Sequence, residues 1–439
     1  MTRASCNAYR KAGDIVRIAI IGTGIAGNVA AYRLRQRHDI TVFESGSHVG
    51  GHTNTVDVEE NGSQYAVDTG FIVFNDRTYP NFIALLDEIG QESQPSVMSF
   101  SVQAENNGLE YAGSSLNMLF AQRRNILRPP FYRMIRDILR FNHAASSRLN
   151  ELDESQTVGA YLQKNAYSNA FIDQYLVPMA AAIWSAEPVA VLDMPIGFLV
   201  RFFSNHGLLQ TSNRPTWRVI KGGSREYVRK LVAGHRDRIR LDSPVQSLRR
   251  HSDGVEVCSA AGGRENFDYV FVACHSDQAL SLLADATAAE REVLGAIRYQ
   301  SNEAILHTDA SLMPRRRRAW AAWNYHIPAD RQRHVAVTYN MNILQGLATS
   351  KQYLVTLNDD RHIEPQNILR RIQYDHPIYS RESVVAQGRQ AEINCDRTFY
   401  CGAYWRNGFH EDGVVSALNA LEHFEARLAD EQLHLRRAS

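Results

Sequence analysis

The chain has 439 residues, of which 44% are hydrophobic and 22% charged, so it has the composition of a globular protein with more than one core. A total of 48 Lys and Arg against 47 Asp and Glu leaves a formal net charge of +1, which argues against a dedicated nucleic-acid binder. The five cysteines are scattered without a CxxC pair, so the sequence indicates no disulfide framework, predicts no metal site and fits a cytoplasmic protein.

Residues 1–14 lack the apolar run of a signal peptide and are expected to form a flexible tail. The next stretch, Ile15 to Ile21 (IVRIAII), predicts a strand that is buried on both faces of a parallel sheet. A glycine turn and a segment of helical periodicity follow it. In this turn Gly22 allows a tight bend, Gly24 lets the backbone approach a pyrophosphate, and Gly27 lets the helix pack closely on the sheet. The phosphates would then bind at the helix N-terminus.

The second predicted strand, DITVFES, ends in Glu44, whose carboxylate can accept hydrogen bonds from a pair of ribose hydroxyls. Its negative charge favours a free ribose over one that carries a 2′-phosphate. The structural alternative is a glycine turn and a solvated strand end without a ligand. Gly50 and Gly51 follow shortly afterwards and permit a second close backbone approach to a cofactor, which a simple nicotinamide domain does not need.

Four later segments extend this pattern almost to the end of the chain. They are YAVDTGFIVFN, WRVIKGGSREY, RIRLDSPVQSL and TFYCGAYWRNGFHEDGVV. Together with the first motif they resemble the flavin-containing amine oxidase superfamily, which includes amine and polyamine oxidases, protoporphyrinogen oxidase and carotenoid desaturases. The resemblance implies FAD as cofactor. Cys401 precedes Gly402 rather than occupying the position of a tethering cysteine, which favours noncovalent over covalent binding.

The same resemblance implies an α/β fold built from two parts. One is a discontinuous, Rossmann-like FAD-binding domain of the glutathione-reductase type over residues 15–75, 216–285 and 395–430. The other is an inserted α+β substrate domain of the amine oxidase type over 76–215 and 286–394. The residues expected to bind FAD are Gly22, Gly24, Ile25, Ala26, Gly27, Glu44, Gly50, Gly51, His52, Thr69, Gly70, Phe71, Val245, Gly402, Asp412, Gly413 and Val414.

Three segments resemble one bacterial branch of that superfamily in their amino-acid sequence. They are VDTGFIVFNDRTYPN, EYAGSSLNMLFAQRRN and YCGAYWRNGFHEDG. Members of that branch are described as predicted NAD/FAD-binding oxidoreductases and are linked to genes for cyclopropane or methyl-branched fatty acids. The resemblance therefore implies fatty-acyl desaturation, with a lipid methyltransferase as a partner.

The sequence departs from amine oxidases at two places where catalysis is expected. His410 stands where a second aromatic side chain would frame the amine, and Glu303 stands where many members carry a lysine. Both differences favour an apolar substrate that loses a hydride. His410 is a candidate proton acceptor or donor, although it can equally be a histidine bonded to backbone. Tyr404 and Trp405 are candidates for the wall over the flavin ring.

Three alternatives remain open for the function. The chain can be an amine or polyamine oxidase, a flavin-dependent double-bond isomerase, or a flavoprotein without turnover that assists a lipid methyltransferase. Peroxide release with amines identifies the first alternative. Product analysis separates the second from desaturation, because desaturation removes two hydrogens and isomerisation removes none.

Three segments bear on where the protein binds its substrate. FAQRRNILRPPFYRMIRDILRF predicts a basic amphipathic helix that begins near Phe131, and Arg315 to Arg318 form a second basic run. Both can be solvated faces, or they can contact the inner face of a membrane. Tyr175 to Leu209 is apolar but interrupted by prolines, so it predicts substrate-domain core or the lining of an apolar tunnel.

Overall fold

The computed structural model describes residues 15–147, 155–210, 213–329, 336–358 and 363–438. The expected flexible tail of residues 1–14 lies outside the described residues. The chain forms two compact units. Unit 1 comprises residues 1–51, 228–295 and 386–439, and unit 2 comprises residues 52–227 and 296–385.

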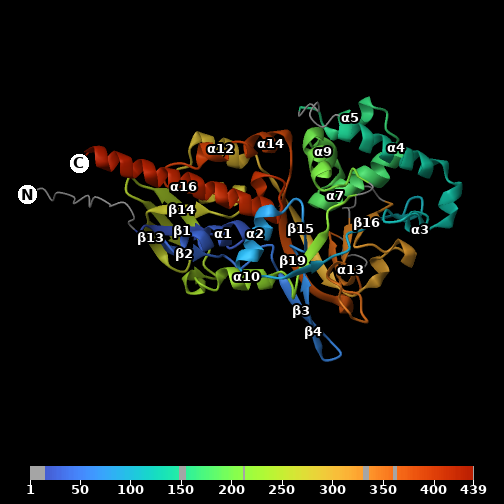
Figure 1. Cartoon of the computed structure of the whole chain (residues 1–439), viewed down its shortest axis with the longest axis horizontal. Helices are drawn as coiled ribbons and strands as arrows, with labels where there is room; N and C mark the ends of the chain where they lie inside the picture. Colours follow the sequence, from blue (N-terminus) through green and yellow to red (C-terminus); the bar gives the residue numbers. More distant parts are fainter. Residues whose placement is uncertain (1–14, 148–154, 211–212, 330–335, 359–362, 439) are drawn as a thin grey trace, which may run out of the picture. The chain divides into compact units, whose positions relative to one another are not determined.

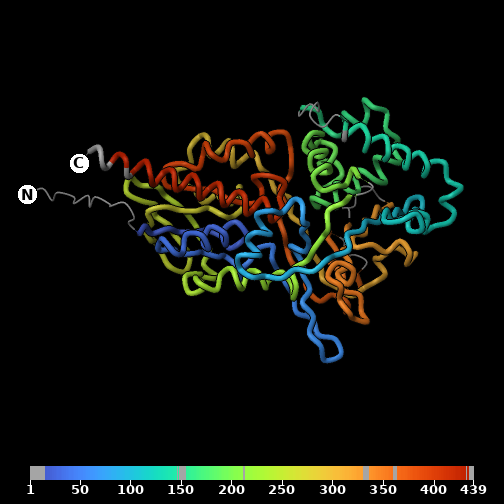
Figure 2. Tube along the Cα trace, in the orientation of Figure 1, coloured from blue at the N-terminus to red at the C-terminus, as the bar shows by residue number. Residues whose placement is uncertain are grey.

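Unit 1 is built on a five-stranded parallel sheet in the order β10-β2-β1-β14-β20. Segments far apart in the sequence lie side by side in it, as the colours of Figure 2 show. The elements are β1 (Arg17–Ile21), α1 (Ile25–Leu34), β2 (Asp39–Phe43), η4 (Arg236–Arg238), β10 (Ile239–Arg240), β11 (Val245–Arg250), β12 (Val255–Ser259), β13 (Gly263–Phe267), β14 (Tyr269–Val272), α11 (Ser276–Leu282), α12 (Ala288–Gly295), α15 (Gln390–Ile393), β20 (Thr398–Tyr400), η8 (Ala403–Trp405) and α16 (His410–Ala438).

The first strand of unit 1 forms as the sequence predicts. Ile18, Ala19 and Ile20 of β1 have no exposed surface, because β2 and β14 flank the strand and helices cover the sheet. The long helix α16 packs along α1, so the last helix of the chain lies beside the first (Figure 1). Burial of this branched apolar strand stabilises unit 1.

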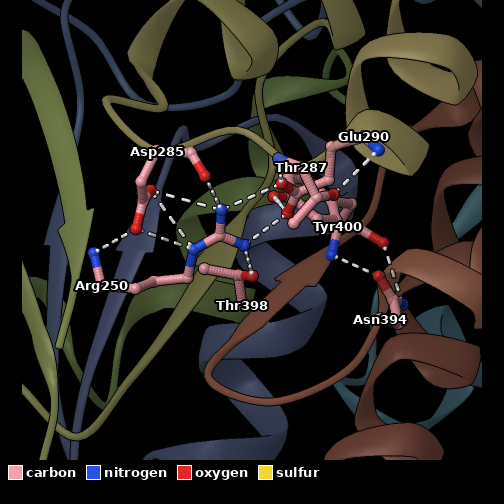
Figure 3. A network of polar contacts seen from close by, with 7 residues as sticks. All are labelled: Arg250, Asp285, Thr287, Glu290, Asn394, Thr398 and Tyr400. Carbon is pink, nitrogen blue, oxygen red and sulfur yellow. Dashed lines mark hydrogen bonds and ion pairs between the residues drawn. The ribbon is translucent and has the colours of Figure 1, made fainter. Parts of the chain in front are cut away.

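An ion cluster at the edge of the same unit joins β11, α12 and β20 (Figure 3). Arg250 lies at its centre and pairs with Asp285 at 3.2 Å and with Glu290 at 2.6 Å. Tyr400 donates its hydroxyl to Glu290 at 2.6 Å, and Thr398 accepts a bond from Arg250 at 3.3 Å. The cluster fixes the loop before α12 against the edge strand β20.

Unit 2 contains a seven-stranded sheet in the order β19-β15-β18-β17-β16-β7-β8, antiparallel except between β16 and β7. A hairpin, β3–β4, and a small sheet, β5-β9-β6, complete its strands. The strands are β3 (Thr55–Glu60), β4 (Ser63–Asp68), β5 (Val73–Asn75), β6 (Ser93–Pro95), β7 (Phe100–Ala104), β8 (Leu109–Ala112), β9 (Trp217–Ile220), β15 (Tyr299–His307), β16 (Trp323–Ile327), β17 (Ala336–Asn340), β18 (Leu354–Leu357) and β19 (Ile368–Pro377).

The helices of unit 2 gather mostly between residues 116 and 205. They are α2 (Pro80–Glu88), α3 (Leu116–Leu119), η1 (Arg123–Leu127), α4 (Pro129–Ser147), α5 (Val158–Lys164), α6 (Asn169–Phe171), η3 (Ile172–Leu176), α7 (Val177–Trp184), α8 (Pro188–Asp193), α9 (Ile196–Asn205), η5 (Ala310–Leu312), η6 (Arg317–Ala319), α13 (Met341–Gln345) and η7 (Pro365–Asn367). Two further helices, α10 (Arg225–Val232) and α14 (Arg381–Gln387), each run across a boundary between the units.

Two sequence predictions about this helical region are confirmed. The basic helix expected near Phe131 is α4, which begins two residues earlier. The apolar stretch from Tyr175 to Leu209 forms several short helices rather than one long one, and Trp184, Phe198 and Phe202 pack together inside it. None of the helices in the described ranges is long and apolar enough to cross a membrane.

Candidate functional site

The carboxyl end of β1 lies at a switch point of the parallel sheet. Ile21 at this end pairs with Phe43 of β2 on one side and with Val272 of β14 on the other. From β1 the chain continues to β2 on one side of the strand. The later strands β14 and β20 extend the sheet on the other side. Ligands of open parallel sheets bind at such points, outside the carboxyl ends of the strands.

The glycine turn after β1 separates close packing from open space. A Cβ atom on Gly27 would lie 2.0 Å from the carbonyl oxygen of Gly22, so only glycine fits there. A Cβ atom on Gly24 would meet nothing within 4 Å. Ile25 and Ala26 begin α1, which has no side-chain cap and no acidic residue in its first turn. The helix N-terminus thus keeps N–H groups for an anion.

Glu44 lies beside this turn and is held by backbone groups. The N–H of Thr23 donates to Oε2 of Glu44 at 2.9 Å, and the N–H of Gly46 donates to Oε1 at 2.8 Å. The Thr23 hydroxyl also donates to Glu44. Each carboxylate oxygen can accept more than one hydrogen bond, so the side chain keeps acceptor capacity for ribose hydroxyls.

The second pair of glycines packs on the first turn. The N–H of Gly50 donates to the hydroxyl of Thr23 at 3.2 Å, and a Cβ atom on Gly51 would approach Cα of Gly24 to 3.1 Å. Thr23 therefore connects Glu44 to Gly50. Sequence reasoning missed Thr23, because its spacing in the glycine motif carries no signal of its own.

Val245 is the first residue of β11 and follows shortly after a contact with Glu44. Two residues earlier, the N–H of Ser243 donates to the carbonyl oxygen of Glu44 at 2.8 Å. The start of β11 is thereby fixed next to the end of β2, within unit 1.

The N-terminus of α16 reaches the same turn from the other end of the chain. A Cβ atom on Gly413 would lie 2.5 Å from Cγ2 of Ile25, so the two helix N-termini are in contact. Asp412 accepts hydrogen bonds from the N–H groups of Asn407, at 3.2 Å, and Phe409, at 3.0 Å. Burial raises the pKa of Asp412 to about 6. Asp412 thus caps the entrance of α16, and Val414, the residue after Gly413, is buried.

Gly402 and the two predicted wall residues form one packed group before α16. The N–H of Gly402 donates to the hydroxyl of Ser416 at 2.8 Å, and a Cβ atom on Gly402 would lie 2.3 Å from the ring of Tyr404. The rings of Tyr404 and Trp405 are 5.1 Å apart, and both side chains are buried. Within the described part of the chain, Nε1 of Trp405 has no hydrogen-bond partner, so it is a buried donor that a bound group can use.

His410 does not have the pKa that its predicted proton-transfer role needs. It is the first residue of α16 and is buried, and burial lowers its pKa to about 3. The imidazole is therefore neutral at physiological pH, where it can accept a hydrogen bond but cannot act as an acid. The expectation of a pKa near neutrality is wrong for this position because desolvation disfavours the charged ring.

In unit 2, His52, Thr69, Gly70 and Phe71 lie together. The N–H of Phe71 donates to the carbonyl oxygen of His52 at 2.8 Å, and a Cβ atom on Gly70 would lie 2.2 Å from that oxygen. The His52 ring stacks on Tyr374 with 4.8 Å between centroids, and the hydroxyls of Thr69 and Tyr374 are 3.1 Å apart. Tyr374, on β19, was not predicted from the sequence.

Glu303, which the sequence aligns with the lysine of other members, lies on β15. Glu303 pairs with Arg371 at 3.1 Å on a solvated face. Its neighbour Asn302 is fully buried, and the Asn302 amide nitrogen lies 2.8 Å from Nδ1 of His376. The His376 ring is 5.4 Å from His52. Successive side chains of a strand point to opposite faces, so Asn302 rather than Glu303 faces this cluster.

A small hollow, roughly the size of one water molecule, opens beside the same strand in unit 2. One part of its wall is aliphatic and the other is polar. Gln300 and Asn358 belong to the wall, and Asn358 donates to Asn302 at 2.7 Å. The hydrogen bonds thus connect the wall of the hollow through Asn302 to His376. The lining residues are Ala181, Ser185, Ala186, Glu187, Gln300, Val337, Leu357 and Asn358.

Comparison with known proteins decides the family. The model of the family "Flavin containing amine oxidoreductase" matches residues 25–335, more than half of the chain. The chain belongs to this family. Its members are FAD-dependent oxidoreductases, so the predicted cofactor, FAD, and the predicted enzyme class are confirmed.

One curated relative is a putative flavin-containing monoamine oxidase, AofH, of Mycobacterium tuberculosis. It is 26% identical over 256 residues, which cover 57% of this chain and 55% of the relative. The chain therefore spans about half the length of the curated relative it matches.

Solved structures agree on the fold. Cyclohexylamine oxidase from Brevibacterium oxydans has a TM-score of 0.68 at 15% identity, and a CLA-producing fatty acid isomerase from P. acnes has 0.64 at 16%. Each match covers 94% of this chain and 100% of the other. These likenesses confirm the predicted fold, an FAD-binding α/β domain with an amine-oxidase-type substrate domain.

The geometry of unit 1 fits FAD in this family. The open space at Gly24, the uncapped N-terminus of α1 and the acceptor Glu44 match a pyrophosphate and a ribose. The buried donor of Trp405 offers a further polar contact. The assignment of individual residues to the cofactor remains a prediction.

Proposed function

We propose that the chain is an FAD-dependent oxidoreductase that removes a hydride from an apolar, fatty-acyl substrate in a desaturase-like reaction. The single observation that carries the proposal is the hollow of unit 2, whose wall combines the aliphatic side chains of Ala181, Ala186, Val337 and Leu357 with a polar edge. Such a wall suits a carbon chain with one polar end. Bound FAD supplies the acceptor for the hydride at its N5 atom.

Removal of two hydrogens from a carbon chain also releases a proton, which needs a path out of the site. In this proposal the imidazole of His376 accepts the proton, and the side chain of Asn302, which is bonded to Asn358, positions that ring. In this proposal the hydride leaves one carbon, the proton leaves its neighbour, and the remaining electron pair forms the new double bond. The amides of Gln300 and Asn358, rather than a lysine on β15, then lie beside the carbon chain.

The resemblance to the branch linked to cyclopropane or methyl-branched fatty acids supports the same substrate class. It also leads to the proposal of a lipid methyltransferase as partner and of a cytoplasmic protein that meets its substrate at the inner face of the membrane. The structural likeness to a fatty acid isomerase keeps isomerisation as a related alternative.

A second candidate function has one specific observation in its favour. Glu187 lies in the wall of the hollow, and a carboxylate there suits a cationic amine. An amine or polyamine oxidase would use the same flavin and would release peroxide when oxygen reoxidises it.

Anaerobic titration of the purified yellow protein tests the two functions side by side. We expect dispersed oleic acid to bleach the flavin absorbance and putrescine to leave it unchanged, with a product that has lost two hydrogens by mass spectrometry. Ala186→Phe, which fills the hollow, should abolish bleaching by oleic acid while the protein keeps its FAD.

Glu187→Gln is the matched variant in the same wall. If the substrate is an acyl chain, it should bleach as fast as the unchanged protein. Bleaching by putrescine that disappears in Glu187→Gln would instead establish the amine oxidase. Bound FAD that no acyl chain or amine reduces would contradict both enzymes and favour the role without turnover.

A further inference from the structure

Apolar side chains are exposed in one stretch of unit 2 between residues 116 and 139. Leu127 is 85% exposed and Leu116 is 77% exposed, which is unusual for leucines in a folded protein. Ile126, Tyr132 and Leu139 are exposed as well. We refer to α3, η1 and α4 together with Arg315–Arg318 as the basic apolar surface.

Arginines surround these apolar side chains, and the arginines donate hydrogen bonds to neutral acceptors. Arg123 donates to the side chain of Asn117, Arg124 to the carbonyl oxygen of Gly108 and Arg128 to that of Asn107. Because these acceptors are neutral, the hydrogen bonds position the guanidinium groups without cancelling their charge.

On α4 itself the charge is only partly balanced. Arg136 and Arg140 lie near one carboxylate, Asp137, at 3.7 and 3.5 Å, and that carboxylate is buried. Arg133 is exposed and has no recorded ion pair among the described residues. The outer face of α4 is therefore strongly positive.

The second basic run is attached to the same scaffold. The backbone N–H groups of Arg315 and Arg316 both donate to the carboxylate of Glu110 on β8, at 3.1 Å each. Their side chains, like those of Arg317 and Arg318, remain exposed. The 3-10 helix η6 contacts α3. The hairpin β7–β8 thus holds both basic runs on one side of unit 2.

We propose that the basic apolar surface docks on an anionic phospholipid bilayer. Leu116, Ile126 and Leu127 would enter the boundary between headgroups and acyl chains, while the arginines bind lipid phosphates. Exposed leucines ringed by arginines are the composition of helices that lie in a membrane interface, and the uncompensated positive charge is complementary to anionic headgroups.

A protein partner fits this surface less well, because stable protein interfaces carry fewer charges at their centre. The inner face of α4 packs on α6 and η3, which connect it to the apolar helices of unit 2. The inference rests on the proposed function, because a membrane would be the source of the lipid-like substrate. The surface itself is argued from exposure and charge.

Co-sedimentation of the full-length, FAD-loaded protein with vesicles tests this docking. The vesicles are phosphatidylcholine, with or without phosphatidylglycerol. We expect binding to the phosphatidylglycerol vesicles that weakens as salt is raised. Leu127→Asp should lower the affinity about tenfold or more, since a charge replaces the most exposed apolar side chain. Arg133→Glu should lower it by a similar factor, because each basic residue near the surface contributes roughly fivefold.

Matched controls come from helices that do not belong to the basic apolar surface. Val385→Asp replaces an apolar side chain that is 62% exposed on α14, and Arg291→Glu reverses an exposed charge on α12. Both should bind vesicles like the unchanged protein. Equal loss in controls and test variants, or no binding to phosphatidylglycerol vesicles, would overturn the proposal.

Two further measurements separate docking from other outcomes. A dimer of the unchanged protein that Leu127→Asp converts to monomer in size-exclusion chromatography would make this surface a contact between copies and would also overturn the proposal. Flavin bleaching by dispersed oleic acid does not require vesicles, so its presence or absence reports on the proposed function independently of docking.

Discussion

Two buried carboxylates, one in each unit, show how hydrogen-bond partners change the effect of burial on the pKa of a carboxyl group. Glu290 in unit 1 accepts two bonds from Arg250, at 2.6 and 2.9 Å, and one from Tyr400 (Figure 3). Asp68 in unit 2 accepts bonds from neutral donors instead, the hydroxyl of Thr55 at 2.6 Å and the N–H and hydroxyl of Ser224 at 2.8 and 2.7 Å.

The pKa values of the two groups move in opposite directions. Burial alone would raise the pKa of Glu290, but the bonds from Arg250 and Tyr400 outweigh it and the pKa is lowered. Burial raises the pKa of Asp68 to about 6, against the weaker lowering by Thr55 and Ser224. A cation thus fixes a buried charge, whereas neutral donors leave the group able to take up a proton.

The largest expected effect is the loss of the cation. Arg250→Met leaves Glu290 and Asp285 without their partner, so the free energy of unfolding should fall by about 3–5 kcal/mol. Urea titration of the FAD-saturated protein measures the change. Arg264→Met is the control, because Arg264 pairs with Glu256 at 3.7 Å on the surface of the same unit and should cost less than about 1 kcal/mol. Similar losses in both variants would show that burial of the Arg250 cluster contributes nothing.

A second pair of variants neutralises each carboxylate in turn. Glu290→Gln should lower the free energy of unfolding by about 2–3 kcal/mol at neutral pH, because charge-assisted hydrogen bonds become neutral ones. Asp68→Asn should change it by less than about 1 kcal/mol, because the lost hydrogen bonds are offset by removal of a buried charge. The same urea titration compares them. A larger loss for Asp68→Asn than for Glu290→Gln would reverse the comparison.

The sequence predicts the parts of the site that depend on neighbours along the chain. The strand Ile15 to Ile21, the glycine turn and Glu44 follow one another within a single strand–turn–helix–strand unit. Each has a local reason for its residue type, such as the close packing of Gly27 on Gly22. The family resemblance then connects this unit to the far end of the chain, where Gly413 contacts Ile25.

The parts that depend on strand register could not be predicted. Asn302 pairs with Tyr374, and Glu303 pairs with Gln373, only because β15 and β19 adopt one particular register. A shift of one residue moves every side chain to the opposite face, and the sequence around Glu303 does not specify which face is inward. The Arg250 cluster is similar, since its members come from three separate segments of the chain.

The pKa of His410 was also out of reach of the sequence. Its value depends on the burial of the α16 entrance, which the packing of distant elements determines. The ordinary pKa of a histidine suggests a proton acceptor or donor at this position, but desolvation makes the ring neutral in the structure.

The smallest expected effect is on the pH dependence of stability, and it tests the proton that Asp68 can take up. The folded pKa of about 6 exceeds the ordinary value of 3.8 for an aspartate. Between these values the folded protein holds a proton that the unfolded chain releases. The stabilisation is therefore complete below the lower value and is lost as the pH rises through about 6. Glu290, whose pKa is lowered, contributes in the opposite sense and loses its stabilisation in acid.

Urea titrations of the unchanged protein and of Asp68→Asn, from about pH 4 to about pH 7, measure this difference. In the unchanged protein, Asp68 should lower the free energy of unfolding by an amount on the order of 1–2 kcal/mol as the pH rises across that range. Asp68→Asn should lack this decrease, since its side chain has no proton to release. The part of the slope that comes from Asp412, whose pKa is also raised to about 6, should remain. Parallel pH profiles for the two proteins would mean that Asp68 stays ionised in the fold. Its neutral donors would then act as a full substitute for the cation that Glu290 has in Arg250.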